Sequence, residues 1–231
     1  MVIWDNLRYE IQEDMAMVLG IYGSGGVGRE VKEIAEELGQ WDEIVFIDDT
    51  VPPDIFRGIR RMPFDEFTEE FTGEMAEIIV ALGEPKYKIN LYEKVKSAGF
   101  GFATVIHPSS IISKSAKIGK GVIVKPGALI SSDALVENNV SIEEYAIIGH
   151  DSVIHKHAQI SSFVMIAGHC EVGEGTYIAI SVPVRDTVKI GAHSVIGMGS
   201  VVQRDIPDGV TAMGSPARPI AVRRDNDRVF R

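Results

Sequence analysis

Every sixth residue from Ile106 to Val202 is isoleucine or valine, and the series has no gap. A small or β-branched side chain follows each of these residues by four positions, as at Ala128 and Ala146. A period of six does not fit an α-helix, which repeats about every 3.6 residues. It is typical of a parallel β-solenoid, in which each hexad supplies one short strand and one turn. Stacked coils of this kind would bury the repeated side chains in one continuous core.

Composition narrows the classes of partner. The chain has 231 residues, a formal net charge of -10 and a pI near 5.1, so its field repels nucleic acid and anionic lipid alike. No stretch approaches the roughly 20 apolar residues that span a bilayer, and the acidic residues within 1–15 argue against a secretory signal. The single cysteine, Cys170, occupies an inward position of its hexad and has no partner for a disulfide. We expect a soluble, cytoplasmic protein with no membrane insertion and no nucleic-acid partner.

Apolar runs and helical patterns alternate in the first hundred residues. Strands are expected at residues 17–22, 43–48 and 76–83. The helix after the first strand would end at Gly39, a suitable C-cap. The helix after the third strand would carry on one side Tyr87, Leu91, Val95 and Ala98. This alternation predicts a parallel α/β sheet. A loop is expected around Pro52 and Pro53, and residues 1–15 form an extension.

The first strand leads into a glycine loop with the spacing G-x-G-x-x-G, at Gly23, Gly25 and Gly28. Asp48 follows Gly28 by about 20 residues at the end of the second strand, as the dinucleotide fingerprint requires. Glycines allow backbone N–H groups to reach phosphate oxygens at a helix N-terminus. An NAD-binding oxidoreductase is one interpretation, and a tight turn without ligand is another. A dinucleotide fold, however, uses two such halves over about 150 residues, and only one precedes residue 103.

The hexads resemble the repeat of left-handed β-helix acyltransferases throughout residues 106–206. In that fold three hexads form one triangular coil, so residues three hexads apart stack, and the chain would make about five to six coils. The segment TAMGSPARPI resembles the G-x-P-A-[KR] end of such helices. The resemblance implies a Rossmann-like α/β half-domain at residues 16–103, a left-handed parallel β-helix at 104–210 and a C-terminal segment at 211–231.

Together the two halves resemble the bacterial sugar acyltransferases of the sialic acid O-acetyltransferase type, which include nucleotide-4-amino-sugar N-acetyltransferases. In that family the glycine loop and an acidic pair hold a nucleotide-sugar instead of NAD. The resemblance assigns this role to Gly23, Ser24, Gly25, Gly26, Asp48 and Asp49. The segment LGEPKYK resembles the family's loop after the third strand, and it implies substrate contacts from Gly83, Glu84 and Lys88. Val27 stands where relatives frequently have a histidine near the sugar.

The chemistry is expected in the segment AIIGHDSVIHKHAQI. Family enzymes carry a histidine followed by a carboxylate in this hexad, and His150 and Asp151 match that pair. Acetyl transfer to an amine needs a base, and an imidazole with an unperturbed pKa near ~6.5 suits that work at neutral pH. The resemblance therefore implies that His150 is the general base. Asp151 would orient the ring or raise its basicity, or act through the turn or on substrate.

Two further positions bear on acetyl-CoA, the implied co-substrate. Gly168 lies three hexads after His150, where it would leave room for the thioester, and a backbone N–H is the usual oxyanion donor. Gln159 stands where relatives often have a second histidine that contacts the acetyl carbonyl, and it would reach the thioester from a neighbouring chain. The family's homotrimer, with active sites between subunits, is the expected assembly. The remaining contacts to coenzyme A would come from Ile180, Gly197, Met198, Pro216, Ala217 and Arg218.

Other functions remain open at this stage. The gamma-class carbonic anhydrases share this fold and have an H-x4-H spacing like that of His150 and His155, but Lys114 and Ser132 occupy the stacked positions of a third ligand, so no metal is expected. Solvated turn positions are expected for His155, His157 and His193. A trimeric scaffold without activity would leave the histidine–aspartate pair unexplained. The favoured function is N-acetylation of a nucleotide-linked 4-amino-4,6-dideoxy sugar in cell-surface glycan biosynthesis, and the alternative is O-acetylation of sialic acid or another sugar.

Overall fold

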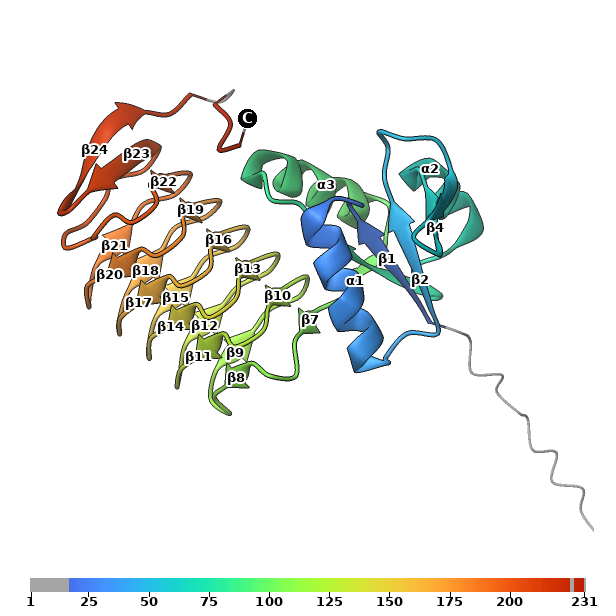
Figure 1. The fold of residues 1–231 in the computed structure, drawn as a ribbon, viewed down its shortest axis with the longest axis horizontal. Helices are drawn as coiled ribbons and strands as arrows, with labels where there is room; N and C mark the ends of the chain where they lie inside the picture. Colours follow the sequence, from blue (N-terminus) through green and yellow to red (C-terminus); the bar gives the residue numbers. More distant parts are fainter. Residues whose placement is uncertain (1–16, 225–226, 231) are drawn as a thin grey trace, which may run out of the picture.

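The computed structural model describes residues 17–224 and 227–230, so the expected extension at residues 1–15 lies outside the described residues. An α/β unit and a triangular β-helix lie side by side (Figure 1). The elements of the α/β unit are β1 (Val18–Tyr22), α1 (Gly26–Leu38), β2 (Glu43–Ile47), β3 (Asp54–Phe56), β4 (Ile59–Met62), α2 (Phe64–Glu70), β5 (Ala76–Val80), α3 (Pro85–Ser97) and β6 (Gly101–Phe102). Their sheet has the strand order β3-β4-β2-β1-β5-β6, and β1 is parallel to both β2 and β5.

The helix α1 forms as its sequence predicts. Val31, Ile34 and Ala35 are buried on one face, where they pack against the sheet. Gly39 ends the helix in the left-handed conformation, at a φ of 59°, and its N–H donates to the carbonyl of Ala35.

The α/β unit departs from the expectations in two places. Pro52 and Pro53 lie in a loop as expected, but the antiparallel hairpin β3–β4 and the helix α2, which follow it, were not predicted. The buried face of α3 carries Lys88, Tyr92 and Val95, whereas Tyr87 and Ala98 are exposed. The face is rotated because α3 packs against the β-helix as well as the sheet, and Lys88 enters that second contact.

The β-helix confirms the hexad prediction strand by strand. Its strands are β7 (Val105–Ile106), β8 (Ile111–Ile112), β9 (Lys117–Ile118), β10 (Ile123–Val124), β11 (Leu129–Ile130), β12 (Leu135–Val136), β13 (Ser141–Ile142), β14 (Ile147–Ile148), β15 (Val153–Ile154), β16 (Gln159–Ile160), β17 (Met165–Ile166), β18 (Glu171–Val172), β19 (Tyr177–Ile178), β20 (Pro183–Val184), β21 (Lys189–Ile190) and β22 (Val195–Ile196). Each strand pairs in parallel with the strand three hexads away, as β13 does with β16. The repeated Ile and Val side chains fill one core, together with the inward-facing Cys170.

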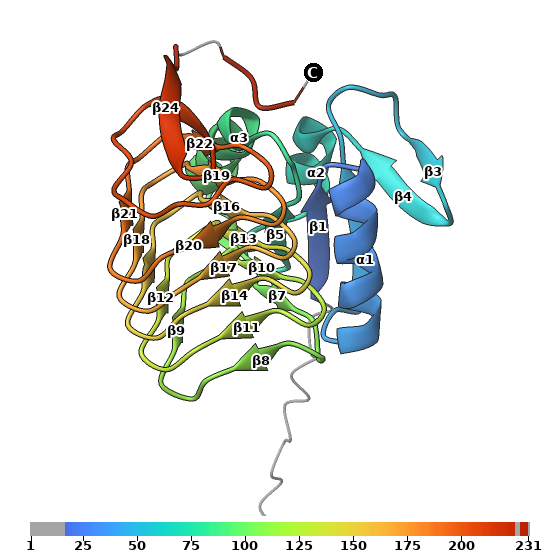
Figure 2. The ribbon, with the colours of Figure 1, turned by 60° about the vertical axis from the view of Figure 1, so that its left-hand side comes forward.

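The β-helix has three faces (Figure 2), which differ in the side chains that their strands project outward. The face with β7, β10, β13, β16, β19 and β22 packs against the α/β unit, and we call it the docking face. The face with β8, β11, β14, β17 and β20 is the apolar face, because its outward side chains are Ile111, Leu129, Ile147, Met165 and Pro183. The face with β9, β12, β15, β18 and β21 is the charged face, with the outward residues Lys117, Glu171 and Lys189.

Left-handed backbone marks the corners between faces. Non-glycine residues with a φ between 54° and 66° occupy corner positions at Asp133, Asn139, Tyr145, Asp151, His157, Phe163, His169, Ser181, Thr187 and His193. Asparagine, aspartate and histidine tolerate this region better than other side chains. The corners therefore carry outward polar groups in addition to those on the strands of the charged face.

The chain closes with the antiparallel pair β23 (Val210–Gly214) and β24 (Ala217–Val222), which extends the docking face. Residues 227–230 then return to the α/β unit, where the carboxylate of Glu84 accepts the N–H groups of Val229 and Phe230 at 3.0 Å. In the part of the chain that the structure describes, no helix is both long and apolar enough to cross a membrane.

A buried polar cluster joins the two units. The Lys88 ammonium is fully buried and donates to the carbonyl of Asn139 at 2.8 Å and to the hydroxyl of Ser141 at 2.6 Å. Burial lowers the pKa of Lys88 to about 7. His157 lies beside it, 2% exposed and hydrogen-bonded to the Asn139 amide at 2.8 Å, so the prediction of a solvated His157 is wrong. Burial lowers its pKa to about 4.

His157 makes the stability of the fold depend on pH. Its pKa is about 4 in the folded chain and about 6.5 when unfolded, so the unfolded chain binds the extra proton between these values. We expect the free energy of unfolding to fall by on the order of 3 kcal/mol, through this group alone, as the pH drops through that window. Urea unfolding at the two ends of the window measures the loss. The His157→Asn variant, which suits a φ of 66°, should show a smaller loss; an equal loss would contradict the assignment.

Candidate active site

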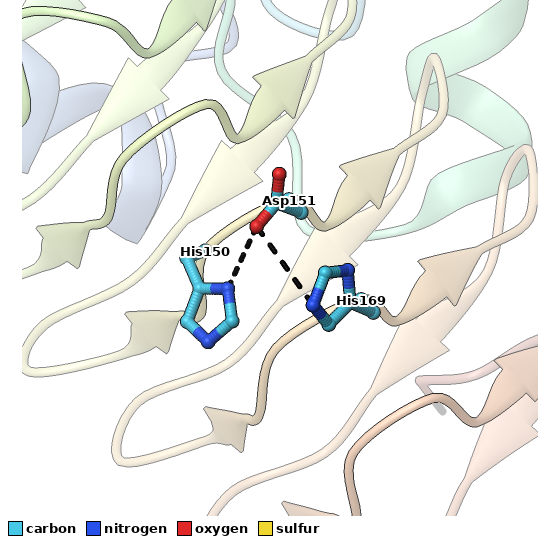
Figure 3. A group of neighbouring side chains, drawn as sticks. All are labelled: His150, Asp151 and His169. Atoms are coloured by element: carbon cyan, nitrogen blue, oxygen red, sulfur yellow. Dashed lines mark hydrogen bonds and ion pairs between the residues drawn. The ribbon is translucent and has the colours of Figure 1, made fainter.

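His150 and Asp151 lie at the corner between the apolar and charged faces, in the turn that joins β14 to β15 (Figure 3). The imidazole Nδ1 lies 2.8 Å from the Asp151 Oδ2, and the His150 side chain is 59% exposed. Two adjacent residues on a strand would point apart. Asp151 instead has a φ of 57° in the turn, which brings its carboxylate to the ring. The contact leaves Nε2 directed away from the carboxylate.

Gly168 stacks on His150 as predicted, but the imidazole ring fills the space that was expected to hold the thioester. A Cβ built at Gly168 would lie 2.6 Å from both Cε1 and Nε2 of the imidazole. Glycine is therefore needed here because the ring itself occupies the space over this residue. The carbonyl of Gly168 accepts the N–H of Thr187, and among the described residues its own N–H has no hydrogen-bond acceptor.

This contact predicts the effect of a single methyl group. In Gly168→Ala the imidazole must move away from Cβ, and the exposed ring can move without disturbing the core. We expect kcat/KM for a reaction in which the His150 ring takes part to fall by about 10- to 100-fold, as displaced reacting groups do, with little change in thermal stability. Steady-state kinetics and thermal denaturation measure the two effects. An unchanged kcat/KM would show that the ring position is unimportant.

His169 is a third member of the corner that the sequence reasoning missed. Its ring lies 4.9 Å from that of His150, edge to face, and its Nε2 lies 3.9 Å from the Asp151 Oδ2. It follows Asp151 by three hexads, so the stacking rule that located Gly168 would also have located His169. By contrast, His155 lies between Glu137 and Glu171 on the charged face and is no part of this group. The His150/His155 pair of the lyase interpretation is therefore not formed.

The glycine loop has two structural and two open glycines. Gly23 has a φ of 115° and a Cβ there would lie 2.7 Å from the carbonyl of Ala81, while a Cβ at Gly28 would overlap the Gly23 carbonyl. No atom lies within 4 Å of a Cβ built at Gly25 or Gly26. The loop thus owes its shape to the first pair and presents the second pair, at the N-terminus of α1, to a ligand.

Asp48 and Asp49, the acidic pair after β2, have different hydrogen-bond partners. Burial alone would raise the pKa of Asp48, but hydrogen bonds from Ser24, at 2.5 Å, and from Thr50 outweigh it and hold that pKa below its usual range. Asp49 accepts the Tyr22 hydroxyl at 2.5 Å, the Phe64 N–H and the Lys94 ammonium, so it fastens the sheet to neighbouring helices. Of the pair, Asp48 is the residue that shares a side-chain hydrogen bond with the glycine loop.

Arg61 is a cation beside the loop that the sequence reasoning missed. Its guanidinium donates to the Ser24 hydroxyl at 3.2 Å and pairs with Asp54 at 2.6 Å. The residue projects from β4, in the segment that was expected to be a loop. The positive charge, the open glycines and the helix N-terminus together make a suitable cradle for a phosphate group.

Residues 82–88, after β5, contact the C-terminal residues and the docking face. Gly83 lies near the Phe230 ring, and Glu84 is occupied by the N–H groups of Val229 and Phe230. Lys88 is fully buried against the docking face, so its predicted contact with substrate is wrong. Gln159 is also buried there, and its amide donates to the carbonyl of Leu82 at 2.9 Å. The side chain is only 5% exposed and its amide is directed to Leu82, so the structure contradicts the expected contact with the acetyl carbonyl.

The residues predicted to bind coenzyme A lie near β23 and β24. Ile180 and Met198 are exposed and stacked one coil apart, and Gly197 contacts the Met213 side chain. Pro216 follows a cis peptide bond and Arg218 is exposed. The Ala217 side chain is buried in the core, which excludes it from a ligand contact. Ile180 and Met198 occupy the corner between the docking and apolar faces, so one chain does not bring them to His150.

The two halves of the predicted site are likewise apart in one chain. The glycine loop belongs to the α/β unit, which is fixed to the docking face through Gln159 and through the Lys125–Glu30 ion pair. His150 lies at the one corner that the docking face does not border. The glycine loop and His150 of one chain therefore lie on different sides of its β-helix.

Comparison with known proteins gives matches to both units. Residues 18–95 match the family model described as the PglD N-terminal domain. The acetyltransferase domain of PglB from Neisseria gonorrhoeae FA1090 is 30% identical, with a TM-score of 0.83 over 88% of this chain and 99% of that one. A variant of perosamine N-acetyltransferase from Caulobacter crescentus, solved with coenzyme A and GDP-perosamine, is 28% identical, with a TM-score of 0.82 over 88% of this chain and 96% of that one.

Curated relatives match a shorter stretch. Galactoside O-acetyltransferase from Escherichia coli (strain K12) is 41% identical over 59 residues, which are 26% of this chain and 29% of that protein. The chain thus spans less than a third of the length of the curated relatives that it matches. The similarity to the PglB domain, in contrast, covers 88% of this chain and 99% of that domain. The chain belongs to the sugar acyltransferases with a left-handed hexapeptide-repeat β-helix, the family of the PglB acetyltransferase domain.

Proposed function

We propose that this protein transfers the acetyl group of acetyl-CoA to the amino group of a nucleotide-linked 4-amino-4,6-dideoxy sugar. The observation that carries the proposal is the presence, in one chain, of a phosphate cradle beside Asp48 and a hydrogen-bonded His150–Asp151 pair on a β-helix corner. Relatives with 28–30% identity support the two ligands: the PglB domain was solved with acetyl coenzyme A, and the perosamine enzyme with coenzyme A and GDP-perosamine.

The geometry of the pair gives the proton path. Asp151 accepts the Nδ1–H of His150, so the lone pair of the neutral ring is on Nε2. As the amine nitrogen attacks the thioester carbonyl, Nε2 takes the proton that the nitrogen loses. The C–S bond then breaks, and the imidazolium returns the proton to the sulfur, which leaves as the free thiol of coenzyme A. The products are the N-acetylated sugar and coenzyme A, and no metal takes part in the transfer.

A backbone group is available for the oxyanion. The tetrahedral intermediate puts negative charge on the former carbonyl oxygen, and a fixed N–H donor stabilises that charge. Gly168 lies directly against His150 and its N–H has no acceptor in the described part of the chain. We assign the oxyanion contact to this N–H, in agreement with the role expected from stacking.

The proposed assembly is a homotrimer with each site between two chains. The separation of the glycine loop from His150 in one chain requires a second chain to complete the site. The apolar face supplies a surface for that contact, since its outward residues are all apolar and Ile111 and Met165 are more than half exposed. The pairing of a nucleotide loop on one chain with the base of its neighbour follows from this arrangement.

The experiment that tests the function is thiol release from acetyl-CoA with a panel of UDP-, dTDP- and GDP-linked amino sugars. Sialic acid and other hydroxyl acceptors form the second arm, because the same base can deprotonate a hydroxyl and the galactoside enzyme acetylates oxygen. Release that depends on a nucleotide-linked amino sugar supports the proposal. Release with hydroxyl acceptors alone would replace it by O-acetyl transfer, and NAD binding without nucleotide-sugar binding would overturn it.

A further inference from the structure

We propose that His150, Asp151 and His169 bind a divalent transition metal ion of the zinc type, and that the bound ion switches off the base. Two imidazoles and one carboxylate are a common ligand set for zinc in proteins, with water in the fourth position. Here the three side chains come from two adjacent coils and converge on one point at the corner (Figure 3). The ion is therefore an inhibitor and not a cofactor of acetyl transfer.

The spacing of the ligand atoms fits a tetrahedral ion. Donors about 2.0–2.1 Å from zinc in tetrahedral geometry lie roughly 3.3 Å from one another. The Asp151 Oδ2 lies 2.8 Å from the His150 Nδ1 and 3.9 Å from the His169 Nε2, on either side of that value, and all three atoms lie within 4.8 Å of one another. The side chains are 46% to 59% exposed, so small rotations can bring each donor to the ion without moving the backbone.

The corner also differs from the other cluster of potential ligands. In the described part of the chain, the second such group is formed by Glu30, Glu143 and Glu144, and the Lys125 ammonium already lies among these carboxylates. Asp151, in contrast, has only the two imidazoles as side-chain partners among the described residues. A cation that binds Asp151 therefore displaces no lysine or arginine.

The consequence for the base follows from imidazole chemistry. A neutral imidazole has one nitrogen that carries hydrogen and one that carries a free lone pair. In the metal-free corner Asp151 accepts from Nδ1–H, and the lone pair is on Nε2. When Nδ1 binds the metal, the hydrogen moves to Nε2, which then has no lone pair to accept the proton of the amine. The metal thus stops the reaction from the side of the ring opposite to substrate.

Zinc binding is tested on the full chain, free of any polyhistidine tag, by calorimetric titration with zinc chloride near neutral pH. Co²⁺ replaces zinc in a parallel titration, because its visible absorption reports tetrahedral coordination. The test variant is His169→Asn and the matched control is His193→Asn. Both positions are exposed corner histidines with a φ of 57° and 54°, a backbone conformation that asparagine tolerates.

We expect one zinc ion per chain, a tetrahedral cobalt spectrum, and a loss of affinity in His169→Asn of at least about 10- to 100-fold, the cost of losing even an outer-shell partner. His193→Asn should bind as the natural chain does. Absence of zinc binding, an octahedral cobalt spectrum, or equal affinity in the two variants would overturn the site.

The proposed inhibition by zinc rests on the proposed acetyltransferase function, whereas zinc binding at the corner does not. Each variant is therefore assayed for thiol release with and without zinc, and each rate is divided by that of the same variant in chelator. Zinc should inhibit the natural chain and His193→Asn, but not His169→Asn at the same concentration. Zinc binding through His169 that leaves the natural rate unchanged would overturn the switch, and calorimetry still reports on the site if no acetyl acceptor is found.

Discussion

Replacing His150 with alanine lowers kcat/KM for acetyl transfer by about 10²- to 10⁴-fold, the contribution that a positioned general base makes. The loss falls on kcat, because the imidazole removes a proton in the transition state and contributes little to nucleotide binding at a glycine loop that lies elsewhere in the chain. Initial rates of thiol release at varied nucleotide-sugar concentration separate kcat from KM. Folding should be unaffected, since the side chain is 59% exposed.

Asp151→Asn provides the control for the orienting carboxylate. The amide can still contact Nδ1, but it carries no charge to stabilise the imidazolium, so its kcat is expected to lie between those of the natural chain and His150→Ala. A His150→Ala enzyme with at least a third of the natural kcat/KM would remove His150 from the chemistry.

The hexads made most of the fold predictable from the sequence. A strict period of six determines which side chains face inward, and stacking by three hexads determines which residues meet, so the core and the contact of Gly168 with His150 followed directly. In the α/β unit, α1 and the three parallel strands were also confirmed, because each has an unambiguous apolar pattern. Local periodicity is enough to predict a helix or strand when a single apolar face of that element is buried.

The errors at Lys88, Gln159 and His157 share one physical cause, the contact between the two units. A lysine, a glutamine and a histidine were assigned to ligands or solvent, but Lys88, Gln159 and His157 are buried where α3 and the loop before it meet the docking face. Polar side chains in such a seam find partners on another element, which no local pattern records. The hairpin β3–β4 was missed for a different reason: its strands have three and four residues and Ile55 is 67% exposed, so they lack the apolar alternation of a half-buried strand.

The positions of His150 and the glycine loop within one chain bear on how neighbouring chains form a site. His150 and the glycine loop of one chain lie on different sides of its β-helix, so we expect each site to take the base from one chain and the nucleotide from its neighbour. Two inactive variants should then restore each other in mixed assemblies. His150→Ala lacks the base, and Gly25→Asp places a carboxylate where a phosphate would bind, at a glycine with a φ of -73° and open space around its Cβ.

Random trimers of the two variants contain intact sites wherever a natural His150 meets a natural loop, which is about a quarter of all sites. The measurement that tests this account most directly is therefore thiol release by co-expressed His150→Ala and Gly25→Asp chains, compared with either variant alone. We predict a rate near a quarter of that of the natural protein. A mixture that forms trimers but stays as inactive as its two components would contradict a site shared between chains.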